Sequence, residues 1–273
     1  MLSRLYLEYN NLTGSIPPSL GNCSNLIDLD LSHNNLSGSI PKEVISLPSI
    51  SIALDLSVNA LSGPIPSEVG LLENLVNLDL SDNRLSGTIP HTIEKCLSLE
   101  QLYLEGNLFE GEIPQALGAL QGLRVLDISS NNFTGQIPNS LAELDGLNYL
   151  NLSFNQLQGE IPKHGIFLNA SVVSLLGNNG LCGGITELNL PSCPFPNSKK
   201  HNLAVALKVI ISVVVCAIFL ALLVCFFIFY NRKRISTKKN ISISSLEHQF
   251  LRISYAELFK ATNGFSTDNI IGV

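Results

Sequence analysis

Leucines in the first part of this chain recur in the spacing L-x-x-L-x-L, and an asparagine follows each such run three residues later. The stretch from Asp28 to Gly38 reads D-L-D-L-S-H-N-N-L-S-G, and that from Asn77 to Gly87 reads N-L-D-L-S-D-N-R-L-S-G. Each unit then closes on G-x-I-P, so a proline recurs once per unit and excludes helices of ordinary length. The asparagines stand at steps of 24, 25, 24, 24, 24 and 24 residues, at Asn10, Asn34, Asn59, Asn83, Asn107, Asn131 and Asn155.

A repeat of this length predicts a leucine-rich-repeat solenoid of the α/β type, built mostly from short parallel strands. The spacing of Leu26, Leu29 and Leu31 turns all three side chains inward around one strand. We expect Asp28, Asp30 and Ser32, which alternate with the leucines, to point outward. Each coil of the solenoid would then have one face exposed to solvent.

The asparagine follows the strand where the chain must turn, and its amide can bond backbone groups of its own coil and of the neighbouring coil. After it, Gly38 permits a bend, and Ile40 with Pro41 is expected to form a second short extended segment. The single step of 25 residues predicts one inserted loop residue after Leu47.

The six cysteines fall into three groups. Cys23 and Cys96 stand where other units have leucine, which favours small buried thiols over a disulfide or a metal site. Cys182 and Cys193 lie beyond the last repeat, where a disulfide that closes the open end of the solenoid is favoured. These features divide the region into seven repeats over residues 1–170 and a cap with linker over residues 171–198. The remaining two, Cys216 and Cys225, lie in an apolar stretch, where lipid-facing packing is favoured over acylation.

That stretch runs from Val209 to Tyr230, and its only polar members are Ser212, Tyr230 and the two cysteines. At about 1.5 Å per residue it is long enough for a bilayer core of about 30 Å, so it predicts a transmembrane helix, placed at residues 203–230. Basic residues are more frequent just after it than just before it, which orients residues 231–273 toward the cytosol.

Glycosylation sequons and charge agree with this orientation. Residues 1–202 carry 19 acidic and 8 basic side chains, while residues 203–273 carry 3 and 8. An acidic outer part has no basic face for nucleic acid, so nucleic-acid binding is not expected. The N-x-[ST] sequons that would lie outside the cell are at Asn11, Asn22, Asn35, Asn132, Asn151 and Asn169.

These residues carry a family resemblance. The L-S-G-x-I-P repeats, the stretch L-C-G-G-I-T-E-L-N-L-P-S-C, and the segment I-S-Y-A-E-L-F-K-A-T-N-G-F-S-T-D-N-I-I-G-V resemble plant leucine-rich-repeat receptor-like serine/threonine kinases. The similarity is greatest to the subfamily of immune pattern-recognition receptors, with plant-specific 24-residue repeats. In that family Ile271 and Gly272 would begin the glycine-rich loop of the kinase domain, so the chain resembles a receptor that is truncated at both ends.

The resemblance implies a membrane-proximal ectodomain, a membrane anchor and a juxtamembrane segment of a plasma-membrane receptor. Its expected partners are an extracellular peptide or protein ligand and a co-receptor kinase, in immune or developmental signalling. Without the rest of a kinase domain no enzyme activity is expected. A non-catalytic receptor-like protein, a decoy or an inactive gene fragment is the alternative.

Ligand contacts are expected on the concave face. One column of outward positions, from Tyr6 through Asp30 to Asn151, is largely generic to the repeat, while a second, from Tyr9 to Phe154, changes chemistry from coil to coil. Aromatic side chains in such columns are the usual carriers of binding energy. No cofactor or metal is expected, because the five histidines are scattered. The candidate contacts are Tyr9, His33, Asp82, Tyr103, Glu105, Tyr149 and Phe154.

Overall fold

A computed structural model describes residues 2–194, 198–246, 254–261 and 264, with side chains left out for 198–207 and 234–246. The chain divides into two units, Met1–Pro194 and Phe195–Val273. The expected start of the glycine-rich loop, Ile271 and Gly272, lies outside the described residues.

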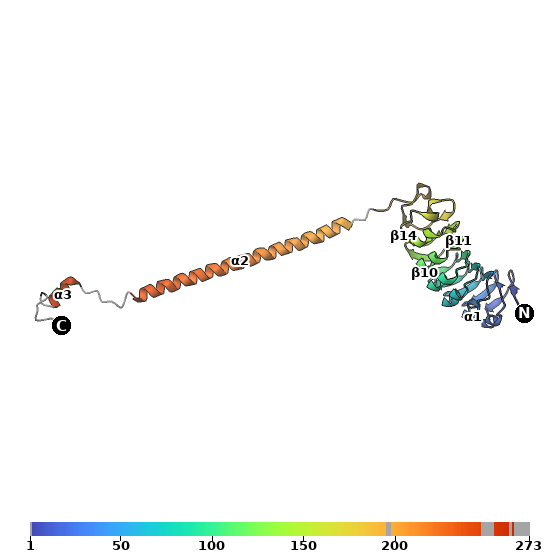
Figure 1. Ribbon diagram of the computed structural model, residues 1–273, viewed down its shortest axis with the longest axis horizontal. Helices are drawn as coiled ribbons and strands as arrows, with labels where there is room; N and C mark the ends of the chain where they lie inside the picture. The colour runs from blue at the N-terminus through green and yellow to red at the C-terminus, as the bar shows by residue number, and fades with distance from the viewer. Residues whose placement is uncertain (1, 195–197, 247–253, 262–263, 265–273) are drawn as a thin grey trace. The chain divides into compact units, whose positions relative to one another are not determined.

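The first unit is a solenoid whose inner face is one parallel sheet (Figure 1). Neighbouring strands pair in register, so that Leu78 lies beside Leu102 and Leu102 beside Leu126. The strands in their order across the sheet are β1 (Arg4–Tyr6), β3 (Asp28–Asp30), β5 (Ala53–Asp55), β7 (Asn77–Asp79), β9 (Gln101–Tyr103), β11 (Val125–Asp127), β13 (Tyr149–Asn151) and β15 (Val173–Ser174).

A second parallel sheet runs along the side of the solenoid, and its strands lie earlier in each unit than the Ile-Pro pair. The expected extended conformation is present at Pro41, with φ −67° and ψ 130°, but the Ile-Pro pair follows the second strand and is not part of it. Pro41 has no N–H for a sheet ladder, and it precedes a helical turn instead. The strands are β2 (Thr13–Ser15), β4 (Asn35–Gly38), β6 (Ala60–Gly63), β8 (Arg84–Gly87), β10 (Leu108–Glu112), β12 (Asn132–Gly135), β14 (Gln156–Glu160) and β16 (Gly180–Cys182).

Short helical turns line the outer side of the solenoid. All but one are 3-10 turns, and the inserted residue of the irregular unit lies between Ile50 and the strand β5, after Leu47 as predicted. The turns are η1 (Pro18–Asn22), α1 (Lys42–Ile45), η2 (Ser67–Leu71), η3 (His91–Lys95), η4 (Gln115–Ala119), η5 (Asn139–Glu143), η6 (Gly165–Leu168) and η7 (Thr186–Leu188).

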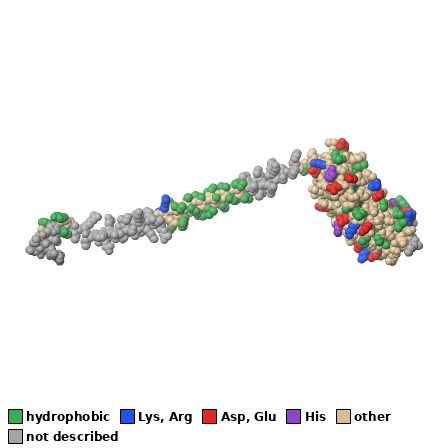
Figure 2. Space-filling view, in the orientation of Figure 1, with side chains coloured by type: hydrophobic (Ala, Val, Ile, Leu, Met, Phe, Trp, Pro, Cys, Tyr) green, Lys and Arg blue, Asp and Glu red, His purple; other side chains and the backbone are tan. Residues whose placement is uncertain are grey.

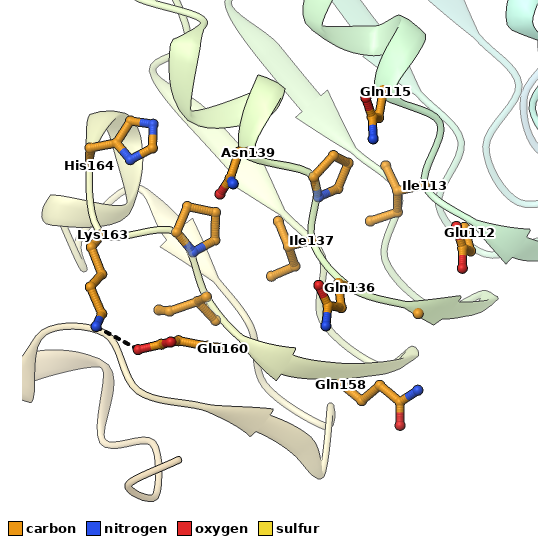
Figure 3. A pocket seen from close by; sticks show the side chains of 14 residues that line it. Glu112, Ile113, Gln115, Gln136, Ile137, Asn139, Gln158, Glu160, Lys163 and His164 are labelled. Atoms are coloured by element: carbon orange, nitrogen blue, oxygen red, sulfur yellow. Dashed lines mark ion pairs between the residues drawn. The ribbon is translucent and has the colours of Figure 1, made fainter. Parts of the chain in front are cut away.

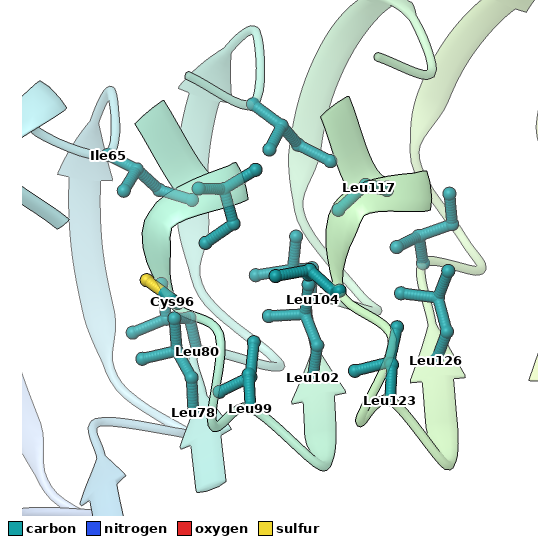
Figure 4. Packing of buried hydrophobic residues seen from close by; sticks show 14 of the residues in the cluster. Ile65, Leu78, Leu80, Cys96, Leu99, Leu102, Leu104, Leu117, Leu123 and Leu126 are labelled. Carbon is teal, nitrogen blue, oxygen red and sulfur yellow. The ribbon is translucent and has the colours of Figure 1, made fainter. Parts of the chain in front are cut away.

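Leucines from both sheets and from the helical turns fill the space between them (Figure 4). The inward orientation predicted for Leu26, Leu29 and Leu31 is confirmed, because each is at most 3% exposed. Asp28 and Ser32, expected to face water, are instead 7% and 4% exposed. Coils about 4.8 Å apart cover each other's short polar side chains, so this part of the face is not exposed to solvent.

The asparagine ladder joins each coil to the one before it, as its chemistry predicted. The side chain of Asn131 donates from Nδ2 to the backbone oxygens of Leu104 in the preceding coil and of Ile128 and Ser129 in its own. Its Oδ1 accepts the backbone N–H of Phe109 at 2.9 Å. The ladder has an eighth member, Asn178, which binds the seventh coil in the same way through Leu152 and Leu157.

The end of the solenoid is closed by the predicted disulfide. Cys182, the last residue of β16, bonds Cys193 with a Cα–Cα distance of 4.8 Å. The N–H of Gly183 also donates to the carbonyl of Pro191. Cys96 is fully buried as predicted, whereas Cys23 in the first turn is only partly buried.

Replacing Cys193→Ser should loosen this end of the solenoid. Opening a loop that spans a sequence separation of 11 removes about 3 kcal/mol of stabilisation, felt mainly in the last coil because each coil contacts only its neighbours. Hydrogen exchange of the full chain should show faster exchange at Leu181 and no change at Leu78. Cys225→Ser is the control, and equal exchange at Leu181 in wild type and Cys193→Ser would contradict the role of the clasp.

The second unit contains the helices α2 (Ser198–Leu246) and α3 (Tyr255–Ala261). No glycine or proline occurs within α2, so nothing interrupts the helix where its apolar part ends. Within its segment Lys208–Lys233, an 18-residue stretch has a mean hydropathy of 3.3 and no buried residue, which fits a single membrane-spanning helix. Figure 2 shows hydrophobic side chains along this segment, with basic side chains at its carboxyl end.

Candidate ligand-binding face

The first predicted column follows the sheet register, but its acidic members mainly stabilise the fold. Asp79 lies beside Asp55 and Tyr103 across the sheet. Its Oδ1 accepts both the backbone N–H and the hydroxyl of Ser81. Equivalent bonds to the serine two residues later hold Asp30, Asp55, Asp127 and Asn151. These side chains close the turn after the strand, and only part of each carboxylate is free for a ligand.

The second column stands where the backbone is left-handed, with φ between 49° and 54° at its non-glycine members. Six different side chains accept a conformation that normally favours glycine or asparagine, because the asparagine ladder holds the next residue. Their chemistry varies, so sequence alone could not show this backbone state. The non-glycine members are Tyr9, His33, Val58, Asp82, Ser130 and Phe154.

At the amino-terminal end of the face, two predicted contacts form a pair. The rings of Tyr9 and His33 stack with centroids 4.0 Å apart and an angle of 11° between planes. Tyr9 remains 75% exposed. Tyr9 and His33 lie four and three strands away from Glu105 in the sheet order, so the pair forms a separate part of the face.

The middle of the face is acidic. Tyr103 lies between Asp79 and Asp127 across the sheet, and the backbone of Asp82 donates to the carbonyl of Glu105. Gly106 is required here, because an added Cβ would lie 2.2 Å from Oδ1 of Asp82. The structure thus brings together three of the predicted contacts, Asp82, Tyr103 and Glu105.

Glu105 stands where five other coils have serine, and its carboxyl group is unusual. Burial, followed by the charges of Asp127, Asp79 and Asp82, raises the pKa of Glu105 to about 7, against a bond to its own backbone that lowers it. Its Oε2 is buried and has no hydrogen-bond partner among the described residues. Because this oxygen is covered, a ligand would approach Glu105 through the exposed part of its side chain.

The pKa of Glu105 has a consequence for stability. The pKa of this carboxyl is higher in the folded than in the unfolded chain. Below the unfolded-state pKa it is protonated in both states and does not affect the free energy of unfolding. As the pH rises toward the folded-state pKa, it increasingly destabilises the fold. Glu105→Gln should therefore raise the melting temperature by about 2–4 °C above pH 7, after allowance for solvent screening. The difference should shrink between pH 7 and about 4.5 and vanish below. Melting curves across pH, with Glu110→Gln as the control, test this; a constant difference would contradict it.

The carboxyl-terminal end of the face is apolar. Phe154 and Tyr149 are 57% and 42% exposed, and Leu176 is 69% exposed. The backbone N–H of Phe154 donates to the carbonyl of Leu176 in the next coil, and its ring lies over Gly177. Leu176 was missed by the sequence analysis. Had Asn178 been counted in the asparagine ladder, Leu176 would have fallen in the same column as Glu105.

Five of the six predicted sequons present exposed asparagines, at Asn11, Asn22, Asn35, Asn132 and Asn169. The sixth, Asn151, is half-buried in the sheet, and its Nδ2 donates to Asp127 and to the hydroxyl of Ser129. A glycan attached to that nitrogen would replace one of its two N–H groups, so at least one of these bonds would be lost. Asn151 is therefore the least accessible of the six.

A groove of about 900 Å³ lies elsewhere, along the second sheet between the last three repeats. Its lining is mostly amide and aliphatic, and its Glu160 and Lys163 pair with each other at 2.6 Å. Figure 3 shows His164 pointing away from that pair, so the groove does not assemble a base, a nucleophile and an acid. Within the described residues, no three His, Cys, Asp or Glu side chains gather to hold a metal ion.

Comparison with known proteins identifies the repeats. One family model, Leucine Rich Repeat, matches residues 1–23, 25–47, 74–96 and 98–120, and a second leucine-rich-repeat model matches residues 113–157. A putative receptor-like protein kinase of Arabidopsis thaliana is 44% identical over 118 residues, which are 40% of this chain and 11% of the relative. The receptor kinase-like protein Xa21 of Oryza sativa subsp. japonica is 44% identical over 109 residues, 40% of this chain and 10% of the relative.

Solved structures show the same fold. The ectodomain of the Arabidopsis thaliana receptor kinase GASSHO1/SCHENGEN3, in complex with CASPARIAN STRIP INTEGRITY FACTOR 2, is 40% identical with a TM-score of 0.65, over 71% of this chain and 22% of that one. The Arabidopsis receptor kinase HAESA, in complex with the peptide hormone IDA and the co-receptor SERK1, is 32% identical with a TM-score of 0.52, over 67% and 38%. The chain spans about a tenth of the length of the two curated relatives above.

Proposed function

We propose that this chain, whose repeats are homologous to those of plant leucine-rich-repeat receptor-like kinases, is a membrane-proximal piece of such a receptor at the cell surface. In this proposal residues 1–198 are extracellular, the apolar part of α2 crosses the plasma membrane once, and residues 231–273 are cytosolic. The repeats bind a peptide or protein ligand, or a co-receptor kinase, in immune or developmental signalling.

The observation that carries this proposal is the apolar segment of α2. Every side chain from Val209 to Tyr230 is exposed, and the segment is long enough for a bilayer core. Water does not tolerate so large an apolar surface on a single helix, whereas lipid does. The basic residues Arg232 and Lys233 at its end support a cytosolic carboxyl side.

Two features of the repeats support an extracellular location. The disulfide between Cys182 and Cys193 is a bond that persists in oxidising compartments. The five exposed sequon asparagines offer glycosylation sites on the same unit. Both features therefore favour an extracellular over a cytosolic location of this unit.

Ligand binding is supported by the concave face. Its column of left-handed residues changes chemistry from coil to coil, while the buried positions repeat almost without change. Side chains that vary on a constant scaffold are suited to recognition. In the solved relatives above, the receptor ectodomains are in complex with CASPARIAN STRIP INTEGRITY FACTOR 2 and with the peptide hormone IDA, which makes a peptide our first candidate ligand here.

Alkaline carbonate extraction of membranes from plant cells that express the full chain tests the anchor. We expect the wild-type chain to stay with the lipid pellet. The double variant Ile218→Lys with Leu222→Lys should be released, because each lysine near the middle of a span costs about 2.5–3.5 kcal/mol. Complete release of the wild-type chain would contradict the proposed membrane anchor.

A further inference from the structure

The concave face of the last coils is an open sheet face with an uneven distribution of charge. Phe154 just after β13 and Leu176 just after β15 form an apolar surface, with Tyr149 at the start of β13, and no described part of the chain covers it. The coils of β7 and β9 are acidic, through Asp82 and Glu105. One coil, that of β11, separates the two surfaces along the axis of the solenoid.

Both surfaces lack partners. Phe154 and Leu176 are more than half exposed although one backbone bond joins their coils, and exposed apolar surface of this kind marks contact sites. Glu105 has a buried Oε2 without a hydrogen-bond partner among the described residues. The Glu105 side chain as a whole is only half-buried, so a cationic side chain above it would be attracted by its carboxyl group and by the neighbouring carboxylates of Asp79 and Asp127.

We propose that this face binds an extended peptide with a basic side chain over Glu105 and an apolar side chain, four residues away in the peptide, over Phe154 and Leu176. The inference rests on the proposed ligand-binding function and specifies its substrate class. The occupant runs along the solenoid axis, across the strands.

The spacing follows from the sheet. Glu105 follows β9, Phe154 follows β13, and Leu176 follows β15, so the apolar surface begins two strands and ends three strands from Glu105. Strands about 4.8 Å apart make this about 10–14 Å. An extended peptide covers that distance in three or four residues, at about 3.4 Å each. Successive side chains of an extended peptide point to opposite sides, so two side chains face the same surface only when they are an even number of residues apart. Of the two possible spacings, three and four, only four meets this condition.

Fluorescence anisotropy with the full chain in lipid nanodiscs tests the spacing. The probes are labelled synthetic peptides in a Ser-Thr host, with one Arg and one Phe placed two, three, four or five residues apart. We expect the peptide with spacing four to bind about tenfold more tightly than the peptide with spacing three. Replacing its Arg by Glu should abolish binding, because the carboxylates would then repel it.

Two variants test which residues of the face contact the two peptide side chains. Glu105→Gln should weaken the Arg peptide about tenfold and leave an Arg-to-Gln version of the peptide unchanged. Phe154→Ala should weaken both versions equally. Tyr9→Ala, at the other end of the face, is the matched control and should change neither.

The outcomes separate the inference from the function on which it rests. Equal affinity at all spacings, or no binding of any probe, overturns the inference. If binding is weakened by Phe154→Ala but shows no dependence on spacing, the inference fails while the concave face remains a ligand surface. Binding that Tyr9→Ala weakens and Phe154→Ala does not would place the ligand at the other end, and would also overturn the inference.

Discussion

Asn131→Ala should lower the free energy of unfolding of the repeat unit by about 3–5 kcal/mol. The alanine would leave the N–H of Phe109 without its partner and would remove the shorter of the two bonds to the carbonyl of Leu104, which otherwise accepts only from Asn107 at 3.2 Å. Phe109 and Leu104 both lie in a coil that stacks directly on that of Asn131. Asn131 is only 7% exposed, so water cannot replace these bonds easily. Urea titration of the full chain, followed by circular dichroism, measures the loss.

Asn10→Ala is the matched control, because it removes the same atoms from the same position of another unit. Asn10 is exposed, and its recorded bonds reach only Leu7 and Glu8 of its own coil. Its loss should cost less than about 1 kcal/mol. Similar losses in both variants would mean that the bonds between coils are not the source of the stability.

Phe133→Ala should cost a similar amount, about 3–5 kcal/mol, through loss of packing and creation of a cavity. Phe133 is fully buried, and its ring stacks on Phe109 of the preceding coil with centroids 6.2 Å apart. The two rings occupy positions where most other units have leucine, so the aliphatic neighbours are spaced around them and cannot collapse into the gap. The same urea titration reports the effect.

Phe154→Ala serves as the control for Phe133→Ala, since it deletes the same side chain from a position that is 57% exposed. It should change stability by less than about 1 kcal/mol. This separation also matters for the binding experiment, because Phe154→Ala can then be used without loss of the fold. A large loss of stability in Phe154→Ala would show that its ring belongs to the core rather than to a contact surface.

The fold could be predicted from the sequence because the same pattern of residues recurs in seven units. Leu29, Asn34 and Gly38 each represent a position that recurs from unit to unit. Any one unit therefore predicts the inward strand positions and the asparagine ladder. The disulfide between Cys182 and Cys193 followed from where that frame ends. Pro41 is extended as expected, but the sequence analysis did not predict the second strand, which ends at Gly38 just before the Ile-Pro pair.

The candidate face was harder to predict, because its properties arise between coils. The partner of Tyr6 is Asp28 in the next coil, and the neighbours that raise the pKa of Glu105 come from other coils. No local pattern contains such contacts. The left-handed backbone at Phe154 has no glycine to mark it, and Leu176 lies in a coil that the seven-member ladder did not include.

The central claim is that the repeats face the cell exterior while the carboxyl end of the chain is cytosolic. Full-length chain with one epitope tag at each end, expressed in plant protoplasts, can be stained with antibodies before and after permeabilisation. The proposal predicts that the amino-terminal tag stains on intact protoplasts and the carboxyl-terminal tag only after permeabilisation. The reverse pattern, or staining of both tags only after permeabilisation, would contradict it.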